Sequence, residues 1–219
     1  MTILNDLTKA GKWGPNTGQH ITNIVPITDQ TLGLISLGNI GRAVARKAQA
    51  IGMQVIAYDP YVQPWIAREY RVELVSSLNE VAGRSDFVSM HTPLNNQTTK
   101  LIGAEFFKSM KESAYFINTC RGGTVDETSL IEALEKKEFA GAGIDVFEIE
   151  PTAENNPLFA MENVIVTPHS AGASNRATVA SQVQVGQESA RLLNGTWPMS
   201  LVNPEVRARI EMRAPATRN

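Results

Sequence analysis

Short apolar runs alternate with segments of helical spacing along most of this chain, from residue 31 onward. The runs are almost wholly apolar rather than alternating, which is typical of strands that helices bury on both faces. The pattern predicts an α/β fold with a doubly wound parallel sheet. Strands are expected at Thr31–Ser36, Gln54–Asp59, Asp86–His91, Ala114–Asn118, Ala142–Val146 and Val164–Thr167, with a further short strand near Val72–Val75.

Helices are expected in the intervals between these runs. Residues 40–51 place apolar side chains at helical spacing, and Gly52 is positioned to end that helix. Another helix is expected to begin with Asp126 as its N-cap and to finish at Lys137, since acid at the start and base at the end both suit the helix dipole. A long closing helix is expected over Asn175–Leu193.

Composition narrows the classes of partner. The formal net charge of -2 argues against nucleic acid, and no apolar run approaches the ~20 residues that a membrane-spanning helix needs. Cys120 is the only cysteine, so no intrachain disulfide can form and a cytoplasmic location is expected. One cysteine and three scattered histidines give no metal-ligand spacing, so no metal is expected.

A glycine-rich turn, SLGNIG, follows the first apolar run at residues 36–41. A dinucleotide site of the Rossmann type needs a strand, such a turn, a helix whose N-terminus faces the pyrophosphate, and an acidic residue about 20 positions later. Asp59 ends the second apolar run at a suitable spacing from Gly41. The sequence therefore predicts dinucleotide binding at this turn.

Ser36 departs from the pattern G-x-G-x-x-G, because it stands where the first glycine is expected. If that position needs a backbone conformation that only glycine adopts freely, serine costs on the order of 1 kcal/mol and weakens cofactor binding. The alternative is that serine is tolerated there and forms a hydrogen bond to a phosphate or to water.

Asp59 favours NAD over NADP, because a carboxylate accepts bonds from free ribose hydroxyls and repels a 2′-phosphate. The alternative is a solvated aspartate in a turn before Pro60. NAD is the expected cofactor. The expected domains are a nucleotide-binding domain at residues 31–197, preceded by a connecting helix end and loop at 1–30 and followed by an exposed tail at 198–219.

Three charged side chains follow later apolar runs: Arg121, Glu150 and His169. A fixed cation, a carboxylate and an imidazole beside a dinucleotide site are the groups needed for hydride transfer to or from a 2-oxo or 2-hydroxy acid. Each also has a structural alternative. His169 could be a surface histidine and Arg121 a loop residue in an ion pair, while Glu148 and Glu154 compete with Glu150 for the role of the carboxylate.

From about Gln30 to Val206 the chain resembles the nucleotide-binding domain of the D-isomer-specific 2-hydroxyacid dehydrogenases. Several motifs in family order carry the resemblance, which makes the match specific. They lie at residues 32–41 (LGLISLGNIG), 91–94 (HTPL), 117–127 (INTCRGGTVDE), 145–151 (DVFEIEP) and 167–172 (TPHSAG).

The resemblance implies a role for each matching residue. Arg121 would bind the carboxylate and carbonyl oxygen of the substrate, and His169 would be the acid/base. Glu150 would pair with His169 and orient its ring, while Asp145 would hold the nicotinamide carboxamide. Cys120 is interpreted as a small packing residue. The cofactor would contact Ser36, Gly38, Asn39, Ile40, Gly41, Tyr58, Asp59, Pro60, Thr92, Pro93, Thr119, Cys120, Asp145 and Gly172.

Members of this family usually contain a separate substrate domain, formed mainly by residues before the nucleotide domain. About thirty residues precede the first strand here, too few for a domain of usual size. The chain is therefore expected to bind NAD and a 2-oxo or 2-hydroxy acid but to be poorly active alone, and a homodimer is compatible with the family. One alternative is a non-catalytic NAD-binding regulatory module, comparable to dehydrogenase-like corepressors. Another is a fragment with no independent role.

Overall fold

The computed structural model describes residues 2–14 and 25–209. Contacts within the chain divide it into two compact units, residues 1–169 and residues 170–219. The first unit contains the whole sheet, and the second contains the closing helix. The expected domain limits at residues 30 and 197 stay predictions, and part of the expected N-terminal loop, at 15–24, lies outside the described residues.

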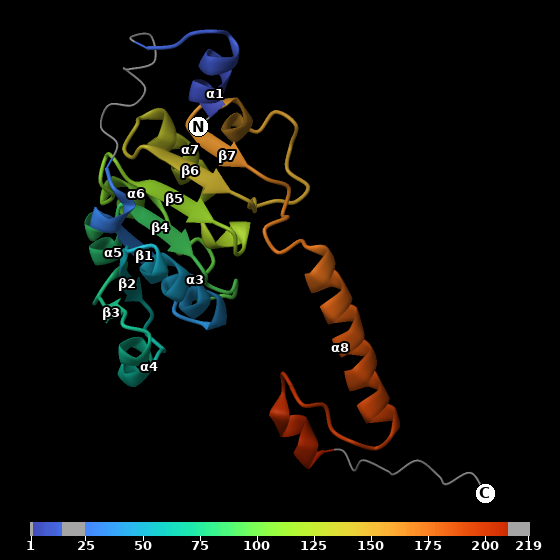
Figure 1. Cartoon of the computed structure of the whole chain (residues 1–219). Coiled ribbons are helices and arrows are strands. Elements are labelled where there is room, and N and C mark those ends of the chain that lie inside the picture. The colour runs from blue at the N-terminus through green and yellow to red at the C-terminus, as the bar shows by residue number, and fades with distance from the viewer. Residues whose placement is uncertain (1, 15–24, 210–219) are drawn as a thin grey trace, which may run out of the picture. The chain divides into compact units, whose positions relative to one another are not determined.

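One parallel sheet of seven strands forms the centre of the first unit, in the order β3-β2-β1-β4-β5-β6-β7 (Figure 1). The strands are β1 Thr31–Ile35, β2 Gln54–Tyr58, β3 Glu73–Leu74, β4 Phe87–Met90, β5 Tyr115–Asn118, β6 Gly141–Ile144 and β7 Val164–Val166. The expected doubly wound parallel sheet is confirmed. The order of strands reverses between β1 and β4, and ligands of such sheets bind at the carboxyl ends of the strands at this point.

Helices precede the first strand and connect the later ones. They are α1 Thr2–Lys9, α3 Asn39–Ala50, α4 Pro64–Glu69, α5 Leu78–Arg84, α6 Ala104–Lys108 and α7 Glu127–Glu135, with 3-10 turns at Ile27–Asp29, Gly122–Thr124 and Pro157–Ala160. Gly52 follows α3 with a φ of +92°, a conformation that suits glycine and ends the helix. Asp126 is the N-cap of α7, as expected. The helix ends at Glu135, before the expected Lys137, which has a left-handed φ of 56°.

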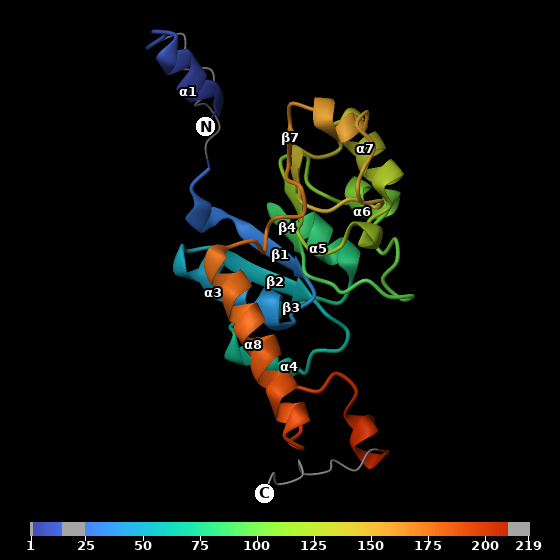
Figure 2. The same ribbon diagram turned by 90° about the vertical axis from the view of Figure 1, so that its right-hand side faces the viewer.

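Two apolar clusters cover the two faces of the sheet. Leu34 belongs to the cluster that includes side chains of α3 and α4, whereas its neighbour Ile35 belongs to the cluster that includes α5, α6 and α7. Figure 2 shows α5 and α6 on the side of the sheet away from α3. Successive residues of a strand point to opposite faces, so burial of both faces explains the apolar sequences of the central strands, whereas Ile165 of the edge strand β7 is exposed.

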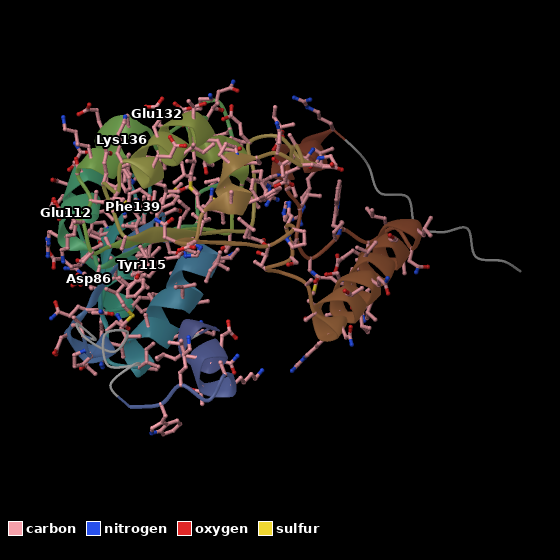
Figure 3. All side chains as sticks on the ribbon, turned by 90° about the horizontal axis from the view of Figure 1, so that it is seen from above. Asp86, Glu112, Tyr115, Glu132, Lys136 and Phe139 are labelled. Atoms are coloured by element: carbon pink, nitrogen blue, oxygen red, sulfur yellow. The ribbon has the colours of Figure 1, made fainter. Side chains whose placement is uncertain are left out.

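Aromatic side chains fill the larger cluster and link neighbouring strands. The ring of Phe107 meets Phe116 edge to face at 5.3 Å and stacks on Phe139 at 5.4 Å. Tyr115, labelled with Phe139 in Figure 3, stacks on Phe87 of the adjacent strand at 5.6 Å. Such pairs add about 0.5–1.5 kcal/mol beyond burial. The sheet is thus a packed platform for the loops at its carboxyl edge.

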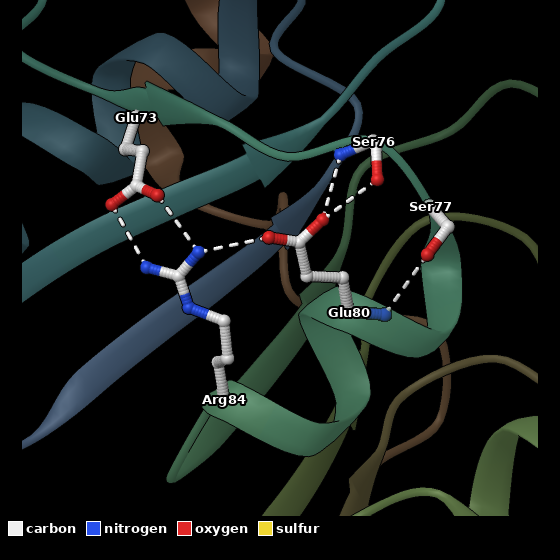
Figure 4. Close-up of polar contacts among 5 residues, drawn as sticks. All are labelled: Glu73, Ser76, Ser77, Glu80 and Arg84. Carbon is white, nitrogen blue, oxygen red and sulfur yellow. Dashed lines mark hydrogen bonds and ion pairs between the residues drawn. The ribbon is translucent and has the colours of Figure 1, made fainter.

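An ion-pair network fixes the short edge strand β3 to α5 (Figure 4). Arg84 lies 2.7 Å from Glu73 of β3 and 3.0 Å from Glu80, one turn earlier on its own helix. The helix begins at Ser77, whose hydroxyl accepts from the Glu80 amide at 3.2 Å. Because these side chains are solvent-exposed, the network positions β3 more than it adds stability.

The second unit contains α8 at Asn175–Leu193, as expected. The Ser174 hydroxyl caps this helix by accepting from the amide of Ala177 at 3.0 Å. A 3-10 turn at Pro204–Ala208 lies within the tail that was expected to be exposed, and residues 210–219 fall outside the description. Over residues 2–14 and 25–209, no helix is long and apolar enough to cross a membrane.

Candidate active site

The side chains selected from the sequence follow neighbouring strands at one edge of the sheet. Ser36 follows β1, Thr92 follows β4, Arg121 follows β5, Asp145 follows β6 and His169 follows β7. Because these strands are parallel and adjacent, all five residues emerge at the same carboxyl edge. This edge includes the reversal between β1 and β4, where a ligand is expected in an open α/β sheet.

The turn between β1 and α3 is compact. A Cβ on Gly41 would lie 2.4 Å from the carbonyl oxygen of Ser36, so this approach requires glycine. Gly38 is the N-cap of α3 and offers no side chain to the first amides of the helix. Those amides are therefore available to an anion, and the turn fits the pyrophosphate of a dinucleotide.

Arg42 adds positive charge to the first turn of α3. Its guanidinium donates to the side chain of Asn39 at 2.5 Å and to the carbonyl oxygen of Gly38 at 3.3 Å. This charge reinforces the positive end of the helix dipole where an anion would bind. Gly172 belongs to the second unit. The remaining expected cofactor contacts are half-buried or exposed in the first unit: Asn39, Ile40, Tyr58, Pro60, Pro93, Thr119 and Cys120.

Ser36 has a φ of 80°, in the left-handed region that glycine adopts freely. Serine therefore occupies a backbone conformation that favours glycine. Its hydroxyl donates to Oδ2 of Asp59 at 3.2 Å. Ser36 thus has a strained backbone. Its side chain forms a hydrogen bond to Asp59, the residue that is expected to hold ribose.

Asp59 connects the ends of β1 and β2. Besides the Ser36 hydroxyl, the amide of Leu37 donates to Oδ2 at 2.8 Å. The amides of Tyr61 and Val62 donate to Oδ1 at 2.9 and 3.1 Å. The carboxylate is thus an organised part of the turn and differs from the solvated aspartate that the sequence left open.

The residues that follow β4 lie beside the glycine turn. Thr92 is buried and donates its hydroxyl to the carbonyl oxygen of Ile35 at 3.1 Å, while the His91 ring lies 3.1 Å from the hydroxyl of Ser89. Burial lowers the pKa of His91 to about 4. The imidazole is therefore neutral at pH 7 and adds no charge beside the turn.

Asn118 holds the turn that presents Arg121. It is buried at the end of β5, accepts from the Cys120 amide at 3.0 Å and donates to the carbonyl oxygen of Arg121 at 3.2 Å. The Cys120 sulfur packs 3.1 Å from the Asn118 side chain. Sequence reasoning missed Asn118, although a lone amide at the end of an apolar run was the available signal. The exposed Arg121 guanidinium suits binding of a carboxylate.

Gly122 brings this turn against the loop that follows β6. A Cβ on Gly122 would lie 1.9 Å from the carbonyl oxygen of Phe147, so the two loops meet backbone to backbone. The contact places Arg121 close enough to Glu150 for its charge to contribute to lowering the pKa of that carboxyl. Arg121 and Glu150 therefore lie on two loops that touch through their backbones.

His169 and Glu150 form a pair at the end of β7. Nδ1 of the imidazole lies 2.7 Å from Oε2 of the carboxylate. The other carboxylate oxygen, Oε1, accepts from the amide of Phe147 at 2.9 Å. Of the competing carboxylates, Glu148 instead pairs with Lys100 at 3.0 Å. The structure thus brings Glu150 to the histidine.

Asp145 is buried at the start of the loop that follows β6 and contains Glu150. Its carboxylate accepts from the hydroxyl of Thr167, and its carbonyl oxygen accepts from the His169 amide at 2.8 Å. The backbone bond fixes His169 at a φ of 51°. Asp145 therefore binds the main chain of His169, a contact that the sequence did not indicate.

A cavity of about 660 Å³ opens beside the His169–Glu150 pair. Its remaining lining is mainly apolar and comes from the ends of β6 and β7 and the segment between them. The other lining residues are Phe147, Pro151, Thr152, Phe159, Val166, Thr167 and Pro168. Few convergent polar groups in an apolar pocket are typical of small-molecule sites.

The pKa of Glu150 lies below its ordinary value of 4.5, chiefly because His169 and then the Phe147 amide donate hydrogen bonds to the carboxylate. Such a group stabilises the fold above pH 4.5 and loses its contribution as pH falls through the lowered folded-state value. We therefore expect Glu150→Gln to be less stable than the parent at pH 7, with the difference shrinking below pH 4.5. Denaturant unfolding of both proteins at a series of acid pH values measures this difference. If the free energy of unfolding falls with pH equally in the parent and in Glu150→Gln, Glu150 is not paired with His169.

Known proteins resemble this chain over most of its length. The family model described as D-isomer specific 2-hydroxyacid dehydrogenase, NAD binding domain, matches residues 1–171. D-3-phosphoglycerate dehydrogenase of Methanocaldococcus jannaschii is 38% identical over 195 residues, covering 89% of this chain and 36% of the relative. Glyoxylate reductase of Korarchaeum cryptofilum is 37% identical over 207 residues, covering 94% and 61%.

Solved structures of 2-hydroxyacid dehydrogenases also resemble this chain. D-lactate dehydrogenase with NAD+ from Lactobacillus jensenii has a TM-score of 0.77 at 34% identity, covering 92% of this chain and 62% of that structure. The holo form of Rhodotorula graminis D-mandelate dehydrogenase has a TM-score of 0.79 at 28% identity, covering 97% and 61%. The chain thus spans less than two thirds of the length of these relatives. It belongs to the D-isomer specific 2-hydroxyacid dehydrogenase family, of which it contains the NAD binding domain.

Proposed function

We propose that this chain binds NAD(H) and uses Arg121, Glu150 and His169 to transfer a hydride between the cofactor and a small 2-oxo or 2-hydroxy acid. The main support is the 2.7 Å contact of His169 with Glu150, at the sheet edge that also contains the glycine turn. The relatives named above are dehydrogenases and reductases of such acids. The proposal includes a cytoplasmic location, which the single cysteine supports.

The geometry accounts for the proton in this reaction. Bound NADH would supply the hydride to the carbonyl carbon. Glu150 is ionised at pH 7 and holds Nδ1–H of His169, so the protonated ring would give its Nε2 proton to the carbonyl oxygen and be left neutral. The guanidinium of Arg121 would bind the substrate carboxylate. In the reverse direction Nε2 accepts the proton from the hydroxyl group.

The pair is open to solvent in this chain. The side chains of His169 and Glu150 are 48% and 35% exposed, whereas hydride transfer benefits from excluding water. We infer that the chain by itself binds NADH but turns over 2-oxo acids slowly. The same exposure favours a second candidate function, a non-catalytic NAD-binding regulatory module. Turnover that depends on His169 separates the two.

Replacing Asp59 with alanine tests the cofactor site. We expect Asp59→Ala to weaken NADH binding about 10- to 100-fold, because a hydrogen bond to a charged group contributes about 1.5–3 kcal/mol. Fluorescence titration with NADH measures the affinity. Asp29→Ala is a matched control, since it removes the same charge from an exposed aspartate before β1.

Thermal unfolding of each variant shows whether the loop ties of Asp59 are needed for folding. An Asp59→Ala protein that folds and binds NADH with the parent affinity would place the cofactor elsewhere. Weakening in both aspartate variants alike would indicate an effect of net charge alone.

A further inference from the structure

The hydroxyl of Ser36 stands at the entrance to the glycine turn. It is the nearest heavy atom to a Cβ built on Gly38, at 3.9 Å. It also lies 3.2 Å from the Asp59 carboxylate. A glycine at position 36 would leave this space open. The hydroxyl therefore lies near Gly38 of the turn and in contact with Asp59.

The acceptor capacity of Asp59 is already occupied. A carboxylate offers about four lone-pair positions. Two of them accept from the amides of Tyr61 and Val62, a third from the amide of Leu37, and the fourth from the hydroxyl of Ser36. The amides are fixed by the backbone of the loops. Only the hydroxyl can leave by rotation of a side chain.

We propose that Ser36 competes with the adenine ribose of NAD(H) for Asp59 and sets the cofactor affinity of this chain below that of a glycine-containing turn. The inference rests on the proposed function, since it requires Asp59 to be the ribose acceptor. Binding then exchanges the bond from Ser36 for a bond from a ribose hydroxyl. The gain at Asp59 is therefore about fivefold smaller than with a free acceptor, because the bond from Ser36 is lost as the bond from ribose forms.

Two variants separate the hydroxyl from the backbone. Ser36→Ala removes the hydroxyl and keeps a side chain at a φ of 80°. Ser36→Gly removes the hydroxyl and also relieves the backbone. If the hydroxyl controls affinity, both variants bind more tightly. If the backbone conformation alone matters, only the glycine variant differs from the parent. Ser113→Ala, at an exposed serine before β5, is the matched control.

The experiment is a fluorescence titration with NADH together with thermal unfolding of the apo proteins. Ser36→Ala and Ser36→Gly are each expected to bind NADH about fivefold more tightly than the parent, equivalent to about 1 kcal/mol. Ser36→Gly is also expected to melt about 2–4 °C above Ser36→Ala, because alanine keeps the strained backbone. The control is expected to match the parent in both measurements.

The outcomes distinguish this inference from the proposed function. Saturable binding with equal affinity in the parent and in both Ser36 variants overturns the competition and leaves NADH binding intact. Weaker binding by Ser36→Ala would mean that the hydroxyl assists the cofactor, which also overturns it. If folded parent and variants alike show no saturable NADH binding, the proposed function fails as well.

Discussion

Replacing His169 with glutamine is expected to lower the rate of 2-oxo acid reduction about 10²- to 10⁴-fold, the usual contribution of a positioned acid/base. Glutamine keeps a polar side chain of similar reach but cannot exchange a proton near neutral pH. Glyoxylate is a suitable first substrate, because one relative is a glyoxylate reductase. With protein in excess over NADH, a single turnover can be followed by loss of NADH absorbance, even where the parent rate is slow.

The control for this variant is its affinity for NADH, which is expected to match that of the parent. Glu154→Gln, at an exposed carboxylate outside the His169 pair, is expected to retain the parent rate. If His169→Gln and the parent reduce glyoxylate at equal rates, the histidine is not the acid/base. The regulatory role would then be the better explanation of this NAD-binding fold.

Replacing Gly122 with alanine is expected to have the largest effect on stability. The added methyl group would lie 1.9 Å from the carbonyl oxygen and 2.0 Å from the carbonyl carbon of Phe147, and 2.6 Å from the nitrogen of Glu148. These are backbone atoms, so the two loops must separate. Overpacking of this kind costs about 3 kcal/mol, which corresponds to a fall in melting temperature of roughly 6–12 °C.

Gly103→Ala is the matched control, because a Cβ at Gly103 meets no atom within 4 Å. We expect that variant to melt close to the parent temperature. Gly122→Ala is also expected to reduce glyoxylate more slowly, since separation of the loops moves Arg121 away from Glu150. Parent-like melting and rate in Gly122→Ala would show that the two loops do not form one site.

The strands could be predicted because the apolar character of each one follows from the burial of its own residues. Both faces of β1, for example, are buried, so Leu34 and Ile35 are both apolar although they face different clusters. The end of α3 was equally readable, since Gly52 supplies the left-handed backbone that stops a helix. Such features need only the residues of one segment. The fold class was therefore accessible from sequence.

The contacts between loops were not accessible in the same way. Glu148 and Glu150 are both acidic residues of one loop, and the residues of that loop alone do not show that Glu148 pairs with Lys100 and Glu150 with His169. The approach of Gly122 to Phe147 joins segments that are distant in sequence, so no local pattern reports it. The resemblance to a family supplied the roles of site residues, and those roles stay predictions until they are measured.

A crystal structure of this chain grown with NADH would show whether the cofactor binds at the carboxyl edge of the sheet. We expect pyrophosphate density on the amides between Gly38 and Gly41, a ribose hydroxyl on Asp59, and the nicotinamide ring at the sheet edge shared with Arg121 and His169. Density for NADH at a different surface would contradict this site. An empty sheet edge in crystals grown at saturating NADH would contradict it as well.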